Sequence, residues 1–133
     1  MWGLSRLLPR LGLGFEQGRW LGAAVAAAGV GLGLAGVAAF RRMRTTVDPT
    51  RPDQATALVT SGMFRWSRNP MYLGFLLILI GWGVVLNNAA AIVAALTFIP
   101  YMNRWQIAPE ERVLRSNFGE AFEAYASRTR RWI

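Results

Sequence analysis

The fold is decided by a run of 35 uncharged residues, 69–103, which reads NPMYLGFLLILIGWGVVLNNAAAIVAALTFIPYMN. The run is too long for one ordinary membrane span. The pair Asn87-Asn88 interrupts it, with 16 residues from Met71 to Leu86 before the pair and about 15 residues after it. We therefore expect a tight helical hairpin over residues 70–107. Its first arm is short for a bilayer core of ~30 Å, so we expect tilt, local thinning or a turn buried below the far surface.

A second uncharged run, the 21 residues 20–40, predicts a membrane-spanning helix. At ~1.5 Å per residue this run would reach ~31 Å, which matches the bilayer core. A secretory signal peptide is the competing interpretation, since Ala24-Val25-Ala26 resembles a cleavage site and three Arg residues precede the run. The apolar part is too long for a signal peptide, and the Arg residues at 41, 42 and 44 would stop transfer.

The amino-acid composition excludes several kinds of catalytic and metal-binding site. The chain has 133 residues, 53% of them hydrophobic and 17% charged, and we treat residues 1–133 as a single domain. All 15 basic residues are Arg, against 7 acidic residues, and the sequence contains no His and no Cys. Disulfides, Cys or His metal sites, thiol nucleophiles and imidazole bases are therefore excluded. The Arg residues flank apolar segments instead of forming one stripe, which favours membrane anchoring and argues against nucleic acid as a partner.

The distribution of Arg predicts the topology. Six Arg lie in the connecting segment 41–69, and six more lie between positions 104 and 131. A hairpin places both groups on one side of the membrane, and the positive-inside tendency makes that side cytoplasmic. Residues 1–19 then lie outside, as an interfacial segment or a shortened span, although they carry three Arg. The expected fold class is an all-α polytopic membrane protein with about three transmembrane helices, one span plus the hairpin.

The C-terminal residues 109–133 read as one amphipathic cytoplasmic helix. Pro109 suits the first helical position, and acidic residues follow it in the first turn. The helix could lie on the membrane surface or cover a site between the connecting segment and the hairpin. Its apolar face is formed by Leu114, Phe118, Phe122, Tyr125, Thr129 and Trp132.

A glycine pattern in the first span resembles a dinucleotide-binding fingerprint only as text. Gly31, Gly33 and Gly36 spell G-x-G-x-x-G, and Asp53 follows 17 residues later. No strand precedes these glycines, and a phosphate inside a membrane span would meet neither water nor a helix N-terminus. Close helix packing through Gly29 and Gly33 explains the pattern better.

The segment 60–74 carries the most specific signal, because it lies where the connecting segment meets the hairpin. Asn69 followed by Pro70 makes a good N-cap, through the Asn69 side chain, and first helical residue, which is the plain structural interpretation. Arg65, Arg68 and Tyr72 surround that helix start. A helix N-terminus flanked by guanidinium groups also suits a carboxylate or a phosphate.

Over residues 45–133 the sequence resembles the isoprenylcysteine carboxyl methyltransferase and phospholipid methyltransferase group of integral membrane enzymes. The first matching element is the Arg-His-Pro-x-Tyr signature, which here reads Arg68-Asn69-Pro70-Met71-Tyr72 and continues to Gly74. The closing Arg130-Arg131-Trp132 resembles the basic end of that family. The second matching element comprises Glu110, Glu111, Leu114, Phe118, Gly119, Phe122 and Tyr125.

The resemblance implies S-adenosylmethionine as cofactor and a lipidic or small hydrophobic methyl acceptor. It implies carboxylate binding by Arg68 or Arg131, and contacts from Glu110 or Glu111 to the cofactor's ammonium and ribose. Within this pair we expect Glu110 to point inward and Glu111 to form a surface ion pair with Arg115. The expected catalytic residues are Glu110 and Arg68. The expected cofactor-binding residues are Arg68, Asn69, Tyr72, Gly74, Glu110, Glu111, Tyr125 and Arg131.

The main departure from the family pattern is Asn69 in place of histidine, a variant that similar bacterial sequences also carry. Asn can hydrogen-bond but cannot take a proton at neutral pH, so general-base work at this position is in doubt while cofactor binding survives. The chain also begins later than many relatives, so a homo-oligomer could be needed to complete a site. We expect a bacterial inner membrane protein, with membrane lipids as its surroundings.

Two other functions stay open at this point. Membrane steroid reductases have a similar C-terminal region, so a reductase that uses a nicotinamide cofactor is one alternative. A non-catalytic membrane scaffold is the other, with Asn69 as its only hint. The methyl acceptor is not named by the sequence: a prenylcysteine carboxylate, a phospholipid amine and a small thiol or phenol all fit.

Overall fold

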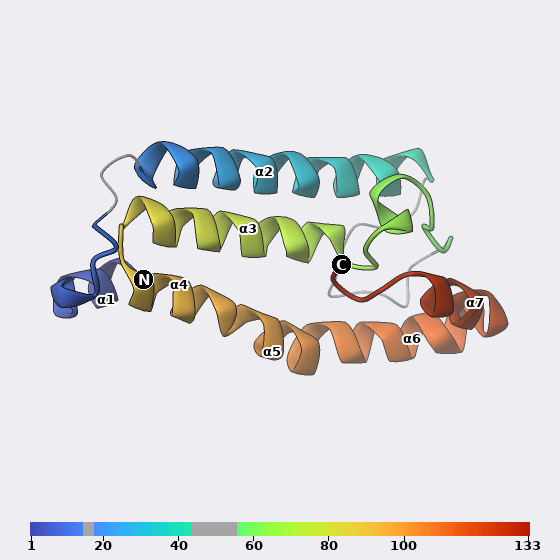
Figure 1. Cartoon of the computed structure of the whole chain (residues 1–133). Coiled ribbons are helices and arrows are strands. Elements are labelled where there is room, and N and C mark those ends of the chain that lie inside the picture. Colours follow the sequence, from blue (N-terminus) through green and yellow to red (C-terminus); the bar gives the residue numbers. More distant parts are fainter. Residues whose placement is uncertain (15–17, 44–55) are drawn as a thin grey trace.

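The computed structural model describes residues 1–14, 18–43 and 56–133, and these residues confirm the all-α class (Figure 1). The expected connecting segment 41–69 therefore lies partly outside the described residues. Among the described residues, β-type pairing is limited to one antiparallel bridge between Gly12 and Asn88. The helices are α1 (Trp2–Leu7), η1 (Pro9–Leu11), α2 (Gly18–Arg42), η3 (Gly62–Arg65), α3 (Pro70–Val85), α4 (Ala89–Leu96), α5 (Phe98–Met102), the π-helical turn η4 (Asn103–Ile107), α6 (Ala108–Phe118) and α7 (Glu120–Arg128).

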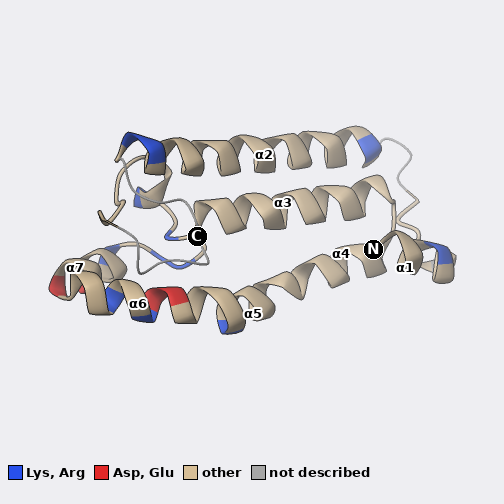
Figure 2. Ribbon diagram, turned by 180° about the vertical axis from the view of Figure 1, so that it is seen from behind, with Lys and Arg blue, Asp and Glu red and all other residues tan. Residues whose placement is uncertain are grey.

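The helix α2 confirms the long apolar helix predicted over residues 20–40. Its 25 residues make it the one described helix that is long and apolar enough to cross a membrane. The next helix, α3, is also apolar but has 16 residues, or ~24 Å, which is shorter than the bilayer core. Figure 2 shows the charged residues gathered toward the two ends of the molecule, with uncharged helix between them.

Helices α2 and α3 lie side by side (Figure 1), and glycines bring their backbones into direct contact. A Cβ atom placed on Gly29 would lie 2.5 Å from the Gly74 carbonyl oxygen, and one on Gly74 would lie 2.6 Å from the Gly29 oxygen. About two helical turns away, Gly22 of α2 and Gly81 of α3 approach each other in the same way. The predicted packing role of Gly29 is confirmed, and Gly33 contributes its backbone nitrogen, 3.0 Å from a Cβ on Gly74.

The hairpin turn falls at the predicted Asn87-Asn88 pair. Asn87 adopts a φ of 49°, a left-handed conformation that Asn tolerates better than most residues. The Asn88 carboxamide oxygen accepts a hydrogen bond of 3.2 Å from the Ala91 backbone N–H and so caps α4. From Phe98 to Phe118 the returning chain passes through α5, η4 and α6, so α6 continues the second arm and does not begin anew at Pro109.

The N-terminal segment is anchored on the hairpin turn, at the left of Figure 1. The Asn88 side-chain amide donates to the Leu8 carbonyl oxygen at 2.9 Å, and the Leu13 backbone N–H donates to the Asn87 oxygen at 3.1 Å. The six residues of α1 reach only ~9 Å. Both alternatives for residues 1–19, an interfacial segment and a shortened span, stay predictions, and α1 by itself is too short to cross a bilayer core of ~30 Å.

The single C-terminal helix expected over 109–133 is wrong. Gly119, at a φ of 49°, separates α6 from α7, and α7 ends at Arg128. Thr129 is extended, so it and Trp132 lie outside the helix that was expected to carry them. The last residues return toward the start of α3 (Figure 1), where side chains of residues 67–69 bind their carbonyl groups.

A small core joins α7 to the segment that precedes α3. Phe122 and Tyr125 of α7 pack against Val59 and Phe64, and all four are at most 5% exposed. Phe40, near the end of α2, meets Phe64 edge to face with ring centres 5.2 Å apart. The C-terminal region therefore packs against the described part of the connecting segment. Its two expected placements, on the membrane surface or over a site, stay predictions.

Candidate functional site

The start of α3, the first turn of α6 and the C-terminal segment meet at one end of the molecule. This meeting point brings together six of the eight residues predicted for the cofactor site: Arg68, Asn69, Tyr72, Glu110, Glu111 and Arg131. The other two, Gly74 and Tyr125, lie elsewhere in the packing.

Glu111 is the centre of an ion-pair network. Its Oε1 accepts from Nη2 of Arg68 at 3.0 Å and from Nε of Arg131 at 3.1 Å, and its Oε2 accepts from Nη2 of Arg131 at 2.5 Å. Burial by itself would raise the pKa of Glu111, but the hydrogen bonds and positive charges of Arg131 and Arg68 hold that pKa below its ordinary value. Glu111 is 8% exposed.

The expected surface ion pair between Glu111 and Arg115 is wrong. Arg115 pairs with Glu123 of α7, and both of those side chains are about half exposed. The four-residue spacing along α6 had suggested Arg115 as the partner of Glu111. The fold instead turns Glu111 inward to two Arg residues that are distant in sequence.

Arg68 ties the C-terminal region to the start of α3. Its Nη1 donates to the carbonyl oxygens of Ala126 at 2.8 Å and Thr129 at 2.6 Å, while Nε and Nη2 donate to Glu111. Its own backbone N–H donates to the Arg130 oxygen at 2.9 Å. All three nitrogens of this guanidinium thus have acceptors within the chain, so Arg68 positions the site. Arg131, with a side chain 37% exposed, is the more accessible guanidinium.

Asn69 stands at the predicted N-cap position of α3, but its side chain makes no capping hydrogen bond. Its carboxamide donates to the Arg131 carbonyl oxygen at 2.9 Å, and its backbone N–H donates to the Ser67 hydroxyl at 3.1 Å. The expectation that Asn69 caps the helix through its side chain is therefore wrong. The residue instead fastens the C-terminal segment over the helix start.

Tyr72 and Glu110 form the second polar unit of the site. The Tyr72 hydroxyl donates to Oε2 of Glu110 at 3.1 Å, and Tyr72 is 7% exposed. Burial, with the charge of Glu111 as a lesser cause, raises the pKa of Glu110 to about 7, although the Tyr72 hydrogen bond opposes the shift. A carboxyl group with this pKa exchanges protons near neutral pH.

Two residues of the site were not predicted. Gln106, on the π-helical turn, hydrogen-bonds to the Tyr72 hydroxyl. Asn103, on the same turn, accepts through Oδ1 from the Trp132 indole N–H at 3.0 Å. The sequence feature that could have identified both is a pair of amide side chains, three residues apart, at the end of the second apolar arm of the hairpin. A π-helical turn next to polar side chains is frequently a functional feature.

Gly74 and Tyr125 were predicted to bind the cofactor, and the structure gives both a packing role. Gly74 faces α2, where its missing side chain lets the backbones approach. Tyr125 is buried in the core under α7, and its hydroxyl donates to the Phe64 carbonyl oxygen at 2.8 Å. Their spacing in the sequence suggested that both residues lie near the site. The spacing could not show that Gly74 faces α2 and that Tyr125 faces the core under α7.

Comparisons with known proteins identify similar sequences. Residues 18–121 match the sequence model of a family described as phospholipid methyltransferase. An uncharacterized protein of Haemophilus influenzae is 43% identical over 63 residues, which is 47% of this chain and all of that protein. Two proteins named as probable protein-S-isoprenylcysteine O-methyltransferases, from Oryza sativa subsp. indica and subsp. japonica, are each 37% identical over 71 residues.

The rice matches cover 53% of this chain but only 37% of the length of those relatives. The similarity therefore concerns one part of larger proteins. No solved structure matched the chain significantly.

Proposed function

The chain belongs to the phospholipid methyltransferase family, and on this premise we propose that it transfers a methyl group from S-adenosylmethionine to a lipidic or small hydrophobic acceptor. The observation that carries the proposal is the paired arrangement of Glu110 with Tyr72 and of Glu111 with Arg68 and Arg131. Both units lie at the end of apolar helices, where a polar cofactor and an apolar acceptor could meet.

The side chains at the start of α3 fit the polar parts of this cofactor. Glu110 offers a half-buried carboxylate for an ammonium group or ribose hydroxyls. Arg131 uses Nε and Nη2 to hold Glu111, and its part-exposed guanidinium offers further donors for a carboxylate. The aromatic faces of Tyr72 and Trp132 suit a sulfonium or an adenine ring.

The remaining work of the protein is positioning. S-adenosylmethionine, when bound, supplies a methyl group on a sulfonium centre that is already a good leaving group. The network of Arg68, Glu111 and Arg131 holds the C-terminal segment over the site, which orients groups and limits water. Glu110, with a pKa near neutrality, is placed to receive a proton from the acceptor. In this proposal Glu110 is catalytic and Arg68 is a positioning residue.

A binding experiment separates this proposal from the two alternatives. Purified protein in lipid nanodiscs should bind radiolabelled S-adenosylmethionine in preference to reduced nicotinamide dinucleotide phosphate. Preference for the nicotinamide cofactor would favour a reductase, and binding of neither would favour a scaffold. Mass spectrometry of lipids from cells with and without the gene should then reveal the methylated acceptor.

The pKa of Glu110 gives a pH dependence for cofactor binding. With a pKa of about 7, only about one Glu110 in ten is ionised at pH 6, so affinity for S-adenosylmethionine should rise about tenfold between pH 6 and pH 8. Equilibrium dialysis at several pH values measures this rise.

Titration of the cofactor's own amine affects wild type and variants alike, so the Glu110→Gln variant is the control. The ratio of wild-type to variant affinity should increase with pH. A ratio that stays constant across this range would remove Glu110 from the cofactor site.

We also propose that the C-terminal region faces the cytoplasm of a bacterial inner membrane, with the N-terminal segment on the other side. The twelve Arg of the connecting segment and tail support this orientation. Because the chain has no Cys, single Cys residues at exposed Ser127 and Leu11 can report on it. An impermeant maleimide applied to intact spheroplasts should label Leu11→Cys and leave Ser127→Cys unlabelled. The reverse pattern would contradict the proposed orientation.

A further inference from the structure

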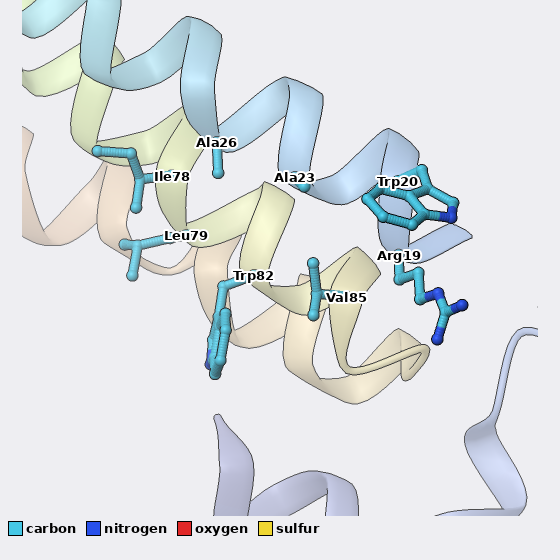
Figure 3. A pocket seen from close by; sticks show the side chains of 8 residues that line it. All are labelled: Arg19, Trp20, Ala23, Ala26, Ile78, Leu79, Trp82 and Val85. Carbon is cyan, nitrogen blue, oxygen red and sulfur yellow. The ribbon is translucent and has the colours of Figure 1, made fainter. Parts of the chain in front are cut away.

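An apolar groove runs along the seam between α2 and α3, at the end of the molecule opposite the candidate site (Figure 3). It has a volume of about 590 Å³, within the range of ligand-binding sites. Ala23 of α2 and Ile78 of α3 contribute to its walls, and Figure 3 shows Trp20 and Arg19 at the N-terminal end of α2 beside it.

A second hollow of about 250 Å³ extends this groove toward the start of α3. The two hollows share Ile78, and the second reaches Met71. Glycines form part of its floor, because Gly29, Gly33 and Gly74 bring no side chains to the seam. From Val85 to Met71 the combined groove follows α3 for ~21 Å at ~1.5 Å per residue. An extended hydrocarbon chain fits an apolar groove of this length.

The charge at the groove is confined to one end. Arg19 is the only charged residue among the described residues that line either hollow. Its guanidinium lies 5.5 Å from the ring centre of Trp20. Residues 1–19 carry three Arg against one acidic residue, Glu16, so this end of the chain is positive overall. An anionic group is therefore the favoured partner at the mouth of the groove.

Two tryptophans mark the depth at which the groove would lie in a bilayer. Trp20 is 71% exposed and Trp82 is 48% exposed, and both line the groove near Arg19. Exposed Trp residues at the end of an apolar helix are typical of the membrane interface, where lipid headgroups lie. The guanidinium of Arg19 is thus at headgroup level, while Ala23 and Ile78 lie deeper along the seam.

We propose that this groove binds an anionic phospholipid, with its phosphate at Arg19 and one acyl chain along the seam between α2 and α3. This lipid is a structural ligand, separate from the methyl acceptor, and its binding does not depend on methyl transfer. The proposal also accounts for Arg residues on the side of the membrane where the positive-inside tendency disfavours them, because an anionic lipid there offsets their charge.

Native mass spectrometry of the detergent-purified protein tests the headgroup contact. Mixed with equal amounts of phosphatidylglycerol and phosphatidylcholine, the wild-type protein should retain one phosphatidylglycerol about tenfold in preference. Arg19→Gln should remove this preference. Arg41→Gln, at the opposite end of the same helix, is the matched control and should keep it.

A second pair of variants tests the acyl-chain groove. Ala23→Phe fills the groove and should reduce retention of both lipids about tenfold, while Ala24→Phe, exposed on the same turn but outside the lining, should not. Circular dichroism and gel filtration confirm that each variant is folded. If folded Arg19→Gln and Ala23→Phe both retain lipid as the wild type does, the proposal is wrong, whatever the outcome for methyl transfer.

Discussion

Glu111→Gln should lower the free energy of unfolding by about 2 to 4 kcal/mol, because it removes the negative charge that pairs with both Arg68 and Arg131. Losing one partner of a buried ion pair costs ~3 to 5 kcal/mol, and the 37% exposure of the Arg131 side chain reduces that cost. Thermal unfolding in detergent, followed by tryptophan fluorescence, measures the loss. Limited proteolysis should show that the segment after α7 becomes accessible.

The matched control is Glu123→Gln, which removes the same charge from an exposed pair. Arg115 and Glu123 have side chains 49% and 55% exposed, so their pair should contribute less than ~1 kcal/mol. Equal losses in the two variants would show that the Glu111 network does not hold the C-terminal segment.

The direction of the pKa shift of Glu111 adds a pH test. A carboxyl group whose folded-state pKa lies below its ordinary value of 4.5 stabilises the folded state above pH 4.5. That contribution is lost as the pH falls through the lowered pKa. The stability difference between wild type and Glu111→Gln should therefore be full at pH 7 and shrink in acid.

Gly74→Leu should prevent α2 and α3 from packing and lower stability by ~3 kcal/mol or more. Even the Cβ atom of the new side chain would lie 2.6 Å from the Gly29 carbonyl oxygen, and backbone atoms cannot move aside as a flexible side chain can. Gly74→Ala should give a smaller loss in the same direction. The yield of monodisperse protein on gel filtration and its thermal midpoint measure both effects.

Gly31→Leu is the control for Gly74→Leu, because a Cβ at Gly31 would meet nothing within 4 Å. It adds the same side chain to the outer face of α2, so its stability should stay near that of the wild type. If Gly74→Leu behaves like Gly31→Leu, the close approach of α2 and α3 does not stabilise the fold.

Local patterns were enough to predict α2 and the hairpin turn. The uncharged run 20–40 predicted α2, and Asn87-Asn88 predicted the turn, because apolar length and turn residues act within a few positions of the chain. The family signatures likewise located the polar cluster at the start of α3, since each signature is a short segment. The packing at Gly29 was predicted because a glycine in an apolar helix has no side chain to hold a neighbouring helix away.

The partners of the site residues were settled by contacts between distant parts of the chain. Glu111 meets Arg131 20 residues away and Arg68 43 residues away, while local spacing had suggested Arg115. The C-terminal segment leaves the helical conformation because Arg68 and Asn69 bind its carbonyl groups, and no periodicity within residues 109–133 contains that information. Helices and turns thus follow from short-range backbone preferences, whereas the pairing of Glu110 with Tyr72 and of Glu111 with two Arg residues required the helices to be packed.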